Sequence, residues 1–185
     1  MSRPVVLVNG LPAAGKSTLA PRLAQALGLP LFSKDVIKET HAEVLGVNPP
    51  AGGSQRAWSR ALGRAASETI WALLADAHSG AVLESSWRAD TRPLVAAGLA
   101  KAQVARVAEV WCEAPLPLLR ARYERRSVSS HAIHGALLDH REWDRMAAHA
   151  EPLALGPVYR LDTTAPVDVA AVAQWCRGVE RAEDG

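Results

Sequence analysis

The sequence predicts an α/β protein with a five-stranded parallel sheet and helices on both of its faces. Short apolar, β-branched runs alternate with longer helical stretches along nearly all 185 residues, a pattern typical of parallel sheets with right-handed crossovers. A glycine-rich loop joins the first strand to the first helix. With 49% hydrophobic residues, a chain of this length can bury one proper core. We therefore expect a single domain over residues 1–185.

The first strand and helix enclose the most specific motif of the chain. Residues 4–9 are an apolar run typical of a buried parallel strand, and Leu19, Leu23 and Leu27 form a helical stripe after it. Between them, residues 10–17 read Gly-Leu-Pro-Ala-Ala-Gly-Lys-Ser and fit G-x-x-x-x-G-K-[ST]. A glycine turn can precede a helix by chance, but the flanking strand and helix favour a phosphate-binding loop.

Such a loop cradles a phosphate chain with its backbone N–H groups and the helix N-terminus. Lys16 would reach the β- and γ-phosphates, and the Ser17 hydroxyl would ligate Mg²⁺. The residues expected to contact the nucleotide in this loop are Gly10, Ala13, Ala14, Gly15, Lys16, Ser17 and Thr18. The sequence therefore predicts that the chain binds a nucleoside triphosphate.

Local signals set the boundaries of the later elements. Gly28 and Pro30 end the first helix, Gly80 ends a long helix, and Pro115 begins another. A proline- and glycine-rich stretch at 48–54 is expected to be a flexible connection. Strands are expected at 31–32, 81–83, 104–112 and 158–161, and helices at about 35–45, 55–77, 91–102, 115–126, 141–150 and 167–179. Ligands of parallel sheets bind beyond the carboxyl ends of the strands, so residues just after each strand are the functional candidates.

Composition argues against several classes of partner. A formal net charge of +2 is too small to favour nucleic acid or an anionic membrane. Cys112 and Cys176 lie far apart and fit no metal spacing, so we expect two reduced core cysteines. No apolar run reaches membrane-spanning length, and residues 1–9 do not resemble a signal peptide. The sequence thus favours a cytoplasmic protein.

Four stretches resemble one known group of proteins. They are residues 9–18, Ser33-Lys34-Asp35-Val36-Ile37-Lys38, Val82-Leu83-Glu84-Ser85-Ser86 and Arg122-Tyr123-Glu124-Arg125-Arg126. In order and spacing they resemble small P-loop kinases of the nucleoside-monophosphate-kinase branch, in the subgroup with chloramphenicol phosphotransferase-like, gluconate-kinase-like and zeta-toxin-like proteins. Ala13 stands where many relatives carry glycine, and the segment around His131 departs from the usual pattern.

This resemblance implies a three-layer P-loop NTPase fold with strand order 2-3-1-4-5. It also implies a lid at about residues 127–141 and acceptor-covering helices at about 36–78. The expected activity is transfer of the γ-phosphate of ATP, with Mg²⁺, to a hydroxyl of a small molecule. A turn at residues 162–166 would run along the adenine, with Thr164 among the nucleotide contacts.

Two carboxylates follow predicted strands. Asp35 is the candidate general base that accepts the proton of the acceptor hydroxyl; the alternative is that it only caps a helix. Glu84 could hold Mg²⁺ through water or orient the acceptor, or it could simply be solvated at a strand end. Lys34 could tune the pKa of its neighbour Asp35 or be an ordinary surface lysine, and the surface position is the one expected.

Arginines form two clusters with helical spacing. Arg122, Arg125 and Arg126 fall on one helix face, where Arg122 and Arg126 could neutralise charge on the transferring phosphoryl group. The alternative is a solvated face paired with Glu124. The second cluster, Arg56, Arg60 and Arg64, could bind an anionic substrate or be an exposed stripe.

Two tryptophans and one more arginine complete the candidates for the acceptor. Trp87 and Arg88 follow a strand end, so Trp87 could stack on substrate and Arg88 could contact it. Trp58 is expected to pack in the core. The substrate candidates are therefore Asp35, Arg56, Arg60, Glu84, Trp87 and Arg88.

Other classes of P-loop protein fit the sequence less well. A GTPase needs N-K-x-D after a strand, and no such tetrapeptide occurs. A mechanical ATPase needs a strand that ends in aspartate or glutamate, and it usually has a longer chain. Because Glu84 ends a predicted strand, this class remains an alternative. A toxin-like kinase of a nucleotide sugar stays an alternative. The identity of the acceptor and the oligomeric state are not encoded in any motif that we find.

Overall fold

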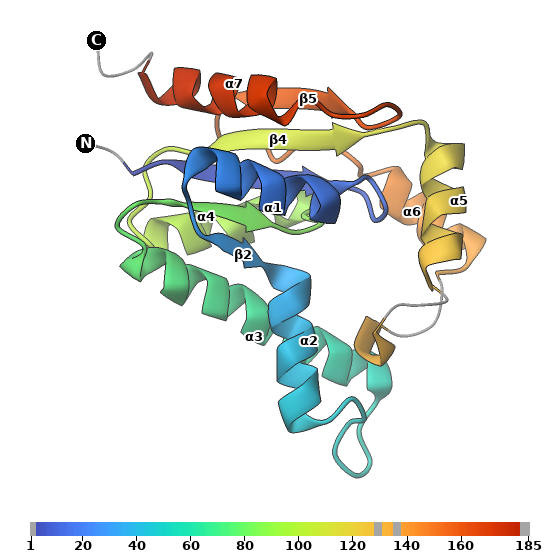
Figure 1. The fold of residues 1–185 in the computed structure, drawn as a ribbon. Coiled ribbons are helices and arrows are strands. Elements are labelled where there is room, and N and C mark those ends of the chain that lie inside the picture. Colours follow the sequence, from blue (N-terminus) through green and yellow to red (C-terminus); the bar gives the residue numbers. More distant parts are fainter. Residues whose placement is uncertain (1–2, 128–130, 135–137, 182–185) are drawn as a thin grey trace.

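In the computed structural model, five strands form one parallel sheet in the order β2-β3-β1-β4-β5 (Figure 1). The strands are β1 (Val5–Gly10), β2 (Leu31–Ser33), β3 (Ala81–Glu84), β4 (Ala108–Glu113) and β5 (Val158–Asp162). The structure describes residues 3–127, 131–134 and 138–181. The predicted α/β fold class, the parallel sheet and the strand order are confirmed.

Helices cover both faces of this sheet. They are α1 (Lys16–Leu27), α2 (Lys34–Leu45), α3 (Gln55–Asp76), α4 (Arg92–Lys101), α5 (Leu116–Ser127), α6 (His140–Ala147) and α7 (Val169–Arg181), with 3-10 helices η1 (Ala89–Thr91) and η2 (Ala132–His134). None of the described helices is both long enough and apolar enough to cross a lipid bilayer.

The strand β1 shows how the two core layers arise. Its side chains alternate between faces, because successive residues of a strand point in opposite directions. Val6 and Val8 pack in the cluster formed with α1 and α7, whereas Val5 and Leu7 pack in the cluster formed with α3 and α4. All six residues of β1 are buried, which explains why its sequence is a continuous apolar run rather than an alternating one.

The helix α2 and the N-terminal part of α3 project beyond one edge of the sheet, while the rest of α3 packs under it (Figure 1). The two helices pack against each other around a small separate cluster of Ala42, Leu62 and Ile133, with the partly buried Trp58 against it. The indole N–H of Trp58 donates to the carbonyl of Gly46 over 2.9 Å. Packing, as expected from the sequence, is therefore the role of Trp58.

Some boundaries differ from the predictions. The strand β4 begins at Ala108 rather than at 104, because the N–H groups of Ala102, Gln103 and Val104 cap the end of α4 instead of joining the sheet. Part of the predicted lid at 127–141, residues 128–130 and 135–137, lies outside the described residues. The described part of it contains η2 and the start of α6. Both cysteines are buried, as predicted, and neither forms a disulfide within the part of the chain that the structure describes.

Candidate active site at the carboxyl ends of the strands

The loop between β1 and α1 has the backbone of an anion-binding turn. Gly10, Ala13 and Gly15 have φ angles of 143°, 63° and 84°, a region that favours glycine. A Cβ on Gly10 would lie 2.4 Å from the carbonyl oxygen of Cys112 on the neighbouring strand. Ala13, where many of the resembling kinases carry glycine, therefore adopts a left-handed conformation that is uncommon for a residue with a side chain.

The Lys16 side chain is folded over this loop. Its Nζ donates to the carbonyl oxygen of Leu11 over 2.8 Å, and the residue is buried. Burial lowers the pKa of Lys16, while the charge of Glu84 acts in the opposite direction. The ammonium group is therefore held at the place where the motif predicts a phosphate, in surroundings that disfavour an isolated positive charge.

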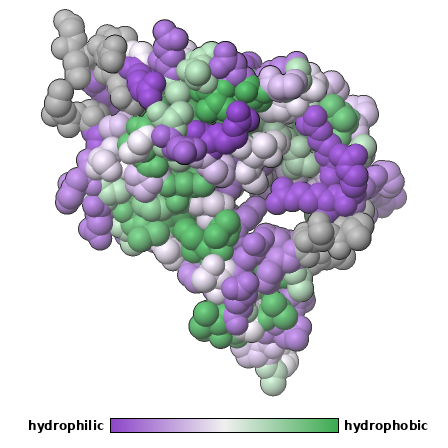
Figure 2. Space-filling model, in the orientation of Figure 1, coloured by the Kyte–Doolittle hydropathy of each residue, from purple (hydrophilic) through white to green (hydrophobic). Residues whose placement is uncertain are grey.

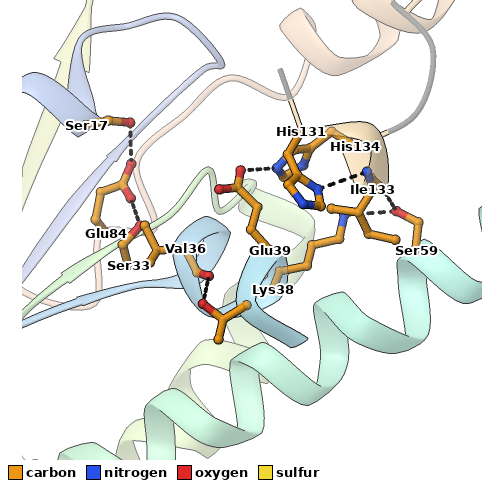
Figure 3. Close-up of polar contacts among 11 residues, drawn as sticks. Ser17, Ser33, Val36, Lys38, Glu39, Ser59, Glu84, His131, Ile133 and His134 are labelled. Carbon is orange, nitrogen blue, oxygen red and sulfur yellow. Dashed lines mark hydrogen bonds and ion pairs between the residues drawn. The ribbon is translucent and has the colours of Figure 1, made fainter. Parts of the chain in front are cut away.

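Three oxygen-bearing side chains meet at the ends of β2 and β3 (Figure 3). The Ser17 hydroxyl donates to Glu84 Oε1 over 3.3 Å, and the Ser33 hydroxyl donates to Glu84 Oε2 over 2.5 Å. Glu84 is 2% exposed, so the alternative of a solvated strand-end carboxylate is wrong. A buried carboxylate beside two hydroxyls is a set of hard oxygen donors, which is the ligand type that Mg²⁺ prefers. The residues present therefore fit a magnesium ion.

Asp35 lies in the first turn of α2 but is not its capping residue. The N-cap position is Ser33, whose hydroxyl is directed to Glu84 and makes no cap bond. The negative charge of Asp35 instead raises the pKa values of Lys16, Lys34 and Lys38, against the larger lowering effect of their burial. Helix capping by its side chain is therefore not the role of Asp35 in this structure.

Lys34, which was expected at the surface, is only partly exposed. Its side chain is half-buried, and burial lowers its pKa. It lines two of the three pockets described next, together with its neighbour Asp35.

Three adjoining pockets run from the glycine-rich loop to the groove between α3 and α4. The first, of about 400 Å³, lies between the loop and the arginines of α5. The second, of about 290 Å³, shares Lys16, Ser17 and Arg126 with the first, and Lys34 and Asp35 with the third. The third has a volume of about 910 Å³. Figure 2 shows hydrophilic side chains around an opening between the parts that carry α5 and α2. Asp35 thus stands where the middle pocket meets the large one.

The arginines of α5 line the pocket at the loop. Arg122, Arg125 and Arg126 all contribute to it, as their shared helix face predicts. Arg122 donates to the carbonyl oxygen of Thr163 over 3.0 Å and to its hydroxyl over 3.4 Å. Arg120 lies on another face, paired with Glu124.

The residue after β5 that contacts the loop is Thr163, one position before the predicted Thr164. A Cβ on Gly15 would be 3.5 Å from the Thr163 side chain, so these residues are packed together. The backbone N–H of Thr164 donates to Asp162 Oδ1 over 2.8 Å in a local turn. The predicted nucleotide contact by Thr164 remains a prediction, while Thr163 is the residue that links the loop to Arg122.

The predicted acceptor residues separate into two groups. Arg60 and Trp87 line the large pocket. Trp87 is 7% exposed and belongs to the core, so it is less open than its position after a strand suggests. Arg56 lies outside that lining and pairs with Glu142 over 3.6 Å. Arg88 also lies outside the lining of the large pocket. Its guanidinium group donates two hydrogen bonds to the carboxylate of Asp90, over 2.9 and 2.6 Å.

Several residues at the site were given no role in the sequence analysis. Tyr123 and His134 line the middle pocket, and His134 Nε2 lies 2.7 Å from Glu39 Oε1 (Figure 3). Lys38 Nζ donates to the Ser59 hydroxyl over 2.9 Å, and that hydroxyl donates to the carbonyl oxygen of Ile133. These contacts tie α2 and α3 to η2.

A buried polar network supports the loop from below. Asn9 Oδ1 accepts from the backbone N–H of Gly10 over 2.7 Å and from that of Trp87 over 2.9 Å. Asn9 Nδ2 donates to Glu109 Oε1 over 2.9 Å. The carboxylate of Glu109, which is fully buried, also accepts from the N–H groups of Leu153 and Ala154. One side chain thus joins the start of the loop to a wall of the large pocket.

A model of the AAA domain family (AAA_33) matches residues 5–153 of the chain. Among solved structures, the chain is similar to a protein from Chloroflexus aurantiacus that is provisionally named a kinase, with 29% identity, a TM-score of 0.78, and coverage of 96% of this chain and 98% of that one. A gluconokinase from Sinorhizobium meliloti shares the fold, at 17% identity and a TM-score of 0.53 over 98% of this chain and 94% of that one.

A short stretch is also similar to a shikimate kinase from Rhodococcus jostii. The two chains are 56% identical over 39 residues, which are 21% of this chain and 23% of that enzyme. The match therefore spans less than a quarter of the length of this curated relative.

Proposed function

The chain belongs to the AAA domain family (AAA_33), and on this premise we propose that it is an ATP- and Mg²⁺-dependent kinase that phosphorylates a hydroxyl group of a small molecule. The observation that carries the proposal is the position of Asp35. This carboxylate lies between the pocket formed with Lys16, Ser17 and Glu84 and a second cavity large enough for a metabolite. The kinase names among the similar proteins support the same activity.

The loop residues bind and orient the donor. The N–H groups between Gly10 and Ser17 and the start of α1 hold the phosphate chain, and the Lys16 ammonium lies against the β- and γ-phosphates. Ser17 and Glu84 would hold Mg²⁺, which when bound draws charge from the β- and γ-phosphate oxygens. Ser33 keeps the Glu84 carboxylate in place for this role through its hydrogen bond.

Asp35 acts on the acceptor. Its carboxylate accepts the proton of the acceptor hydroxyl as the new bond from that oxygen to the γ-phosphorus forms. The bond from the γ-phosphorus to the bridging oxygen breaks, and its electron pair leaves with ADP. Arg122 and Arg126 stabilise the negative charge on the phosphoryl oxygens during this transfer.

An acceptor screen tests this proposal. The purified protein is incubated with ATP, Mg²⁺ and a panel of hydroxyl compounds, ADP formation is followed, and products are identified by mass spectrometry. We expect ADP formation that depends on one class of acceptor and yields its phosphate ester. ADP formation at one rate with and without every acceptor, with inorganic phosphate as the product, would instead assign a non-kinase ATPase.

A further inference from the structure

The large pocket, here called the acceptor cavity, is strongly unbalanced in charge. Its lining contains five cationic side chains and two carboxylates: Lys34, Lys38, Arg60, Arg64, Lys101, Asp35 and Glu68. Of the two carboxylates, Glu68 is already paired with Lys101, at 2.6 Å. The four remaining cations therefore face the cavity with one carboxylate, Asp35, which the proposed reaction uses as the base.

The cations that remain come from two neighbouring helices. Lys34 and Lys38 lie one turn apart on α2, and Arg60 and Arg64 lie one turn apart on α3. No carboxylate among the described residues forms an ion pair with Arg60 or Arg64. Burial lowers the pKa values of both lysines. Lys34 and Lys38 are half-buried, whereas Arg60 and Arg64 are exposed. Gathering four positive charges around one carboxylate is unfavourable unless an anion binds among them.

Part of the lining of the acceptor cavity is apolar. It includes Trp71, Trp87 and Val95, all of which belong to the core. Trp71 packs directly on α4, since a Cβ on Gly98 would lie 2.1 Å from its indole. The indoles are therefore fixed by packing and present a rigid surface for the carbon skeleton of a ligand. A cavity lined by both cationic and apolar side chains fits a compound that has an anionic group and an apolar part.

We propose that the acceptor is a hydroxyl compound that also carries a carboxylate or a phosphate, held by Arg60 and Arg64 with its hydroxyl at Asp35. This inference rests on the kinase function proposed above. Guanidinium groups bind both anions through paired N–H donors, so carboxylate and phosphate share the chemistry recognised here. The anion would replace the missing counter-charges of the cavity, and the apolar side chains would contact the rest of the molecule.

Binding measurements separate this inference from the function on which it rests. Calorimetric titrations compare sugar acids and sugar phosphates with the neutral sugars of the same carbon skeletons, using protein saturated with ADP and Mg²⁺ so that the loop is occupied. We expect at least one anionic compound to bind about tenfold or more tightly than its neutral counterpart. The sugar-acid and sugar-phosphate arms show which of the two anions the cavity takes.

The variant Arg60→Gln/Arg64→Gln should lose this preference while its affinity for ADP stays at the wild-type value. Arg22→Gln, a change on the exposed surface of α1 outside the three pockets, is the matched control and should behave as wild type. Circular dichroism checks that each variant is folded.

Two results would overturn the inference: no panel anion binding better than its neutral partner, or a preference that persists in the double variant. Phosphorylation of a neutral compound alone would reject the anionic acceptor and leave the kinase function intact. Anion binding that depends on both arginines, without phosphoryl transfer, would support the anion site and reject the kinase function.

Discussion

The hydroxyl of Ser33 donates to Glu84 Oε2 over 2.5 Å, so the last residue of β2 orients a carboxylate at the end of β3. The two residues are direct neighbours in the register of the parallel sheet. Because one oxygen of Glu84 is held by Ser33, the other is left facing Ser17. The sheet register thereby brings together hydroxyl and carboxylate oxygens that lie 51 and 67 positions apart in the chain.

This relationship predicts a graded effect on magnesium dependence. Glu84→Gln removes the charge that would hold Mg²⁺, so the Mg²⁺ concentration for half-maximal activity should rise about tenfold or more. Ser33→Ala leaves the charge but frees the carboxylate, and its effect should be in the same direction and smaller. Titration of activity with Mg²⁺ at fixed ATP measures both. Unchanged magnesium curves for the two variants would remove Glu84 from the metal site.

Asp35→Asn separates catalysis from helix stability. Asparagine keeps the shape and removes the base, so kcat should fall by about 10²-fold or more. The melting temperature should change little, because the N-cap of α2 is Ser33. Steady-state kinetics and thermal denaturation check the two parts. Normal turnover by a folded Asp35→Asn protein would mean that another group accepts the proton.

Two arginines of one helix should respond differently to truncation. Arg126 lines the pockets on both sides of the loop, so Arg126→Ala should lower kcat far more than it weakens ATP binding. Arg120 lies over the ring of Trp143, 5.4 Å from its centroid, and pairs with Glu124. Its truncation should therefore lower stability rather than kcat. The sequence alone suggests that Arg120 tolerates the change; its packing on α6 alters that expectation.

Equal and mild effects of Arg120→Ala and Arg126→Ala on kcat, ATP affinity and melting temperature would show that the cluster is a solvated surface. Arg22→Ala on α1, outside the pockets, is the control for loss of a surface arginine.

The half-buried Lys34 predicts a stability that depends on pH. Burial lowers its pKa in the folded protein from the ordinary value of 10.5, so the folded state releases this proton at a lower pH than the unfolded chain does. The burial cost is fully present at neutral pH, and stability rises as pH increases through the folded pKa. Lys34→Met should therefore raise the melting temperature at pH 7, and the gain should shrink toward pH 10.5. If Lys34→Met instead lowers the melting temperature at pH 7, the favourable charge interaction of Lys34 with Asp35 outweighs the cost of its burial.

The parts of the site that the sequence predicts are those that local geometry determines. The phosphate-binding loop is one continuous segment of the chain, so the spacing of its residues alone identifies it. These residues are Gly10, Gly15, Lys16 and Ser17. Glu84 was a candidate because parallel strands end at one edge of a sheet. The strand order came from the resemblance to a known family, since no local pattern specifies it.

Contacts between distant segments could not be predicted in this way. Asn9 and Glu109 are 100 positions apart, and nothing in either strand indicates that a fully buried carboxylate would accept from Asn9, Leu153 and Ala154. Thr163, which packs beside Gly15, was not among the predicted residues, because its contact with the loop depends on how the chain after β5 packs.

The fate of the γ-phosphoryl group tests the central claim most directly. ATP labelled in that group is incubated with wild-type protein and with Lys16→Ala, with and without a panel of hydroxyl compounds, and the label is traced by mass spectrometry. The account predicts that wild-type protein transfers the label to an organic phosphate ester, only when an acceptor is present, and that folded Lys16→Ala does not. Label recovered solely as inorganic phosphate, at a rate independent of every acceptor, or full transfer by Lys16→Ala, would contradict it.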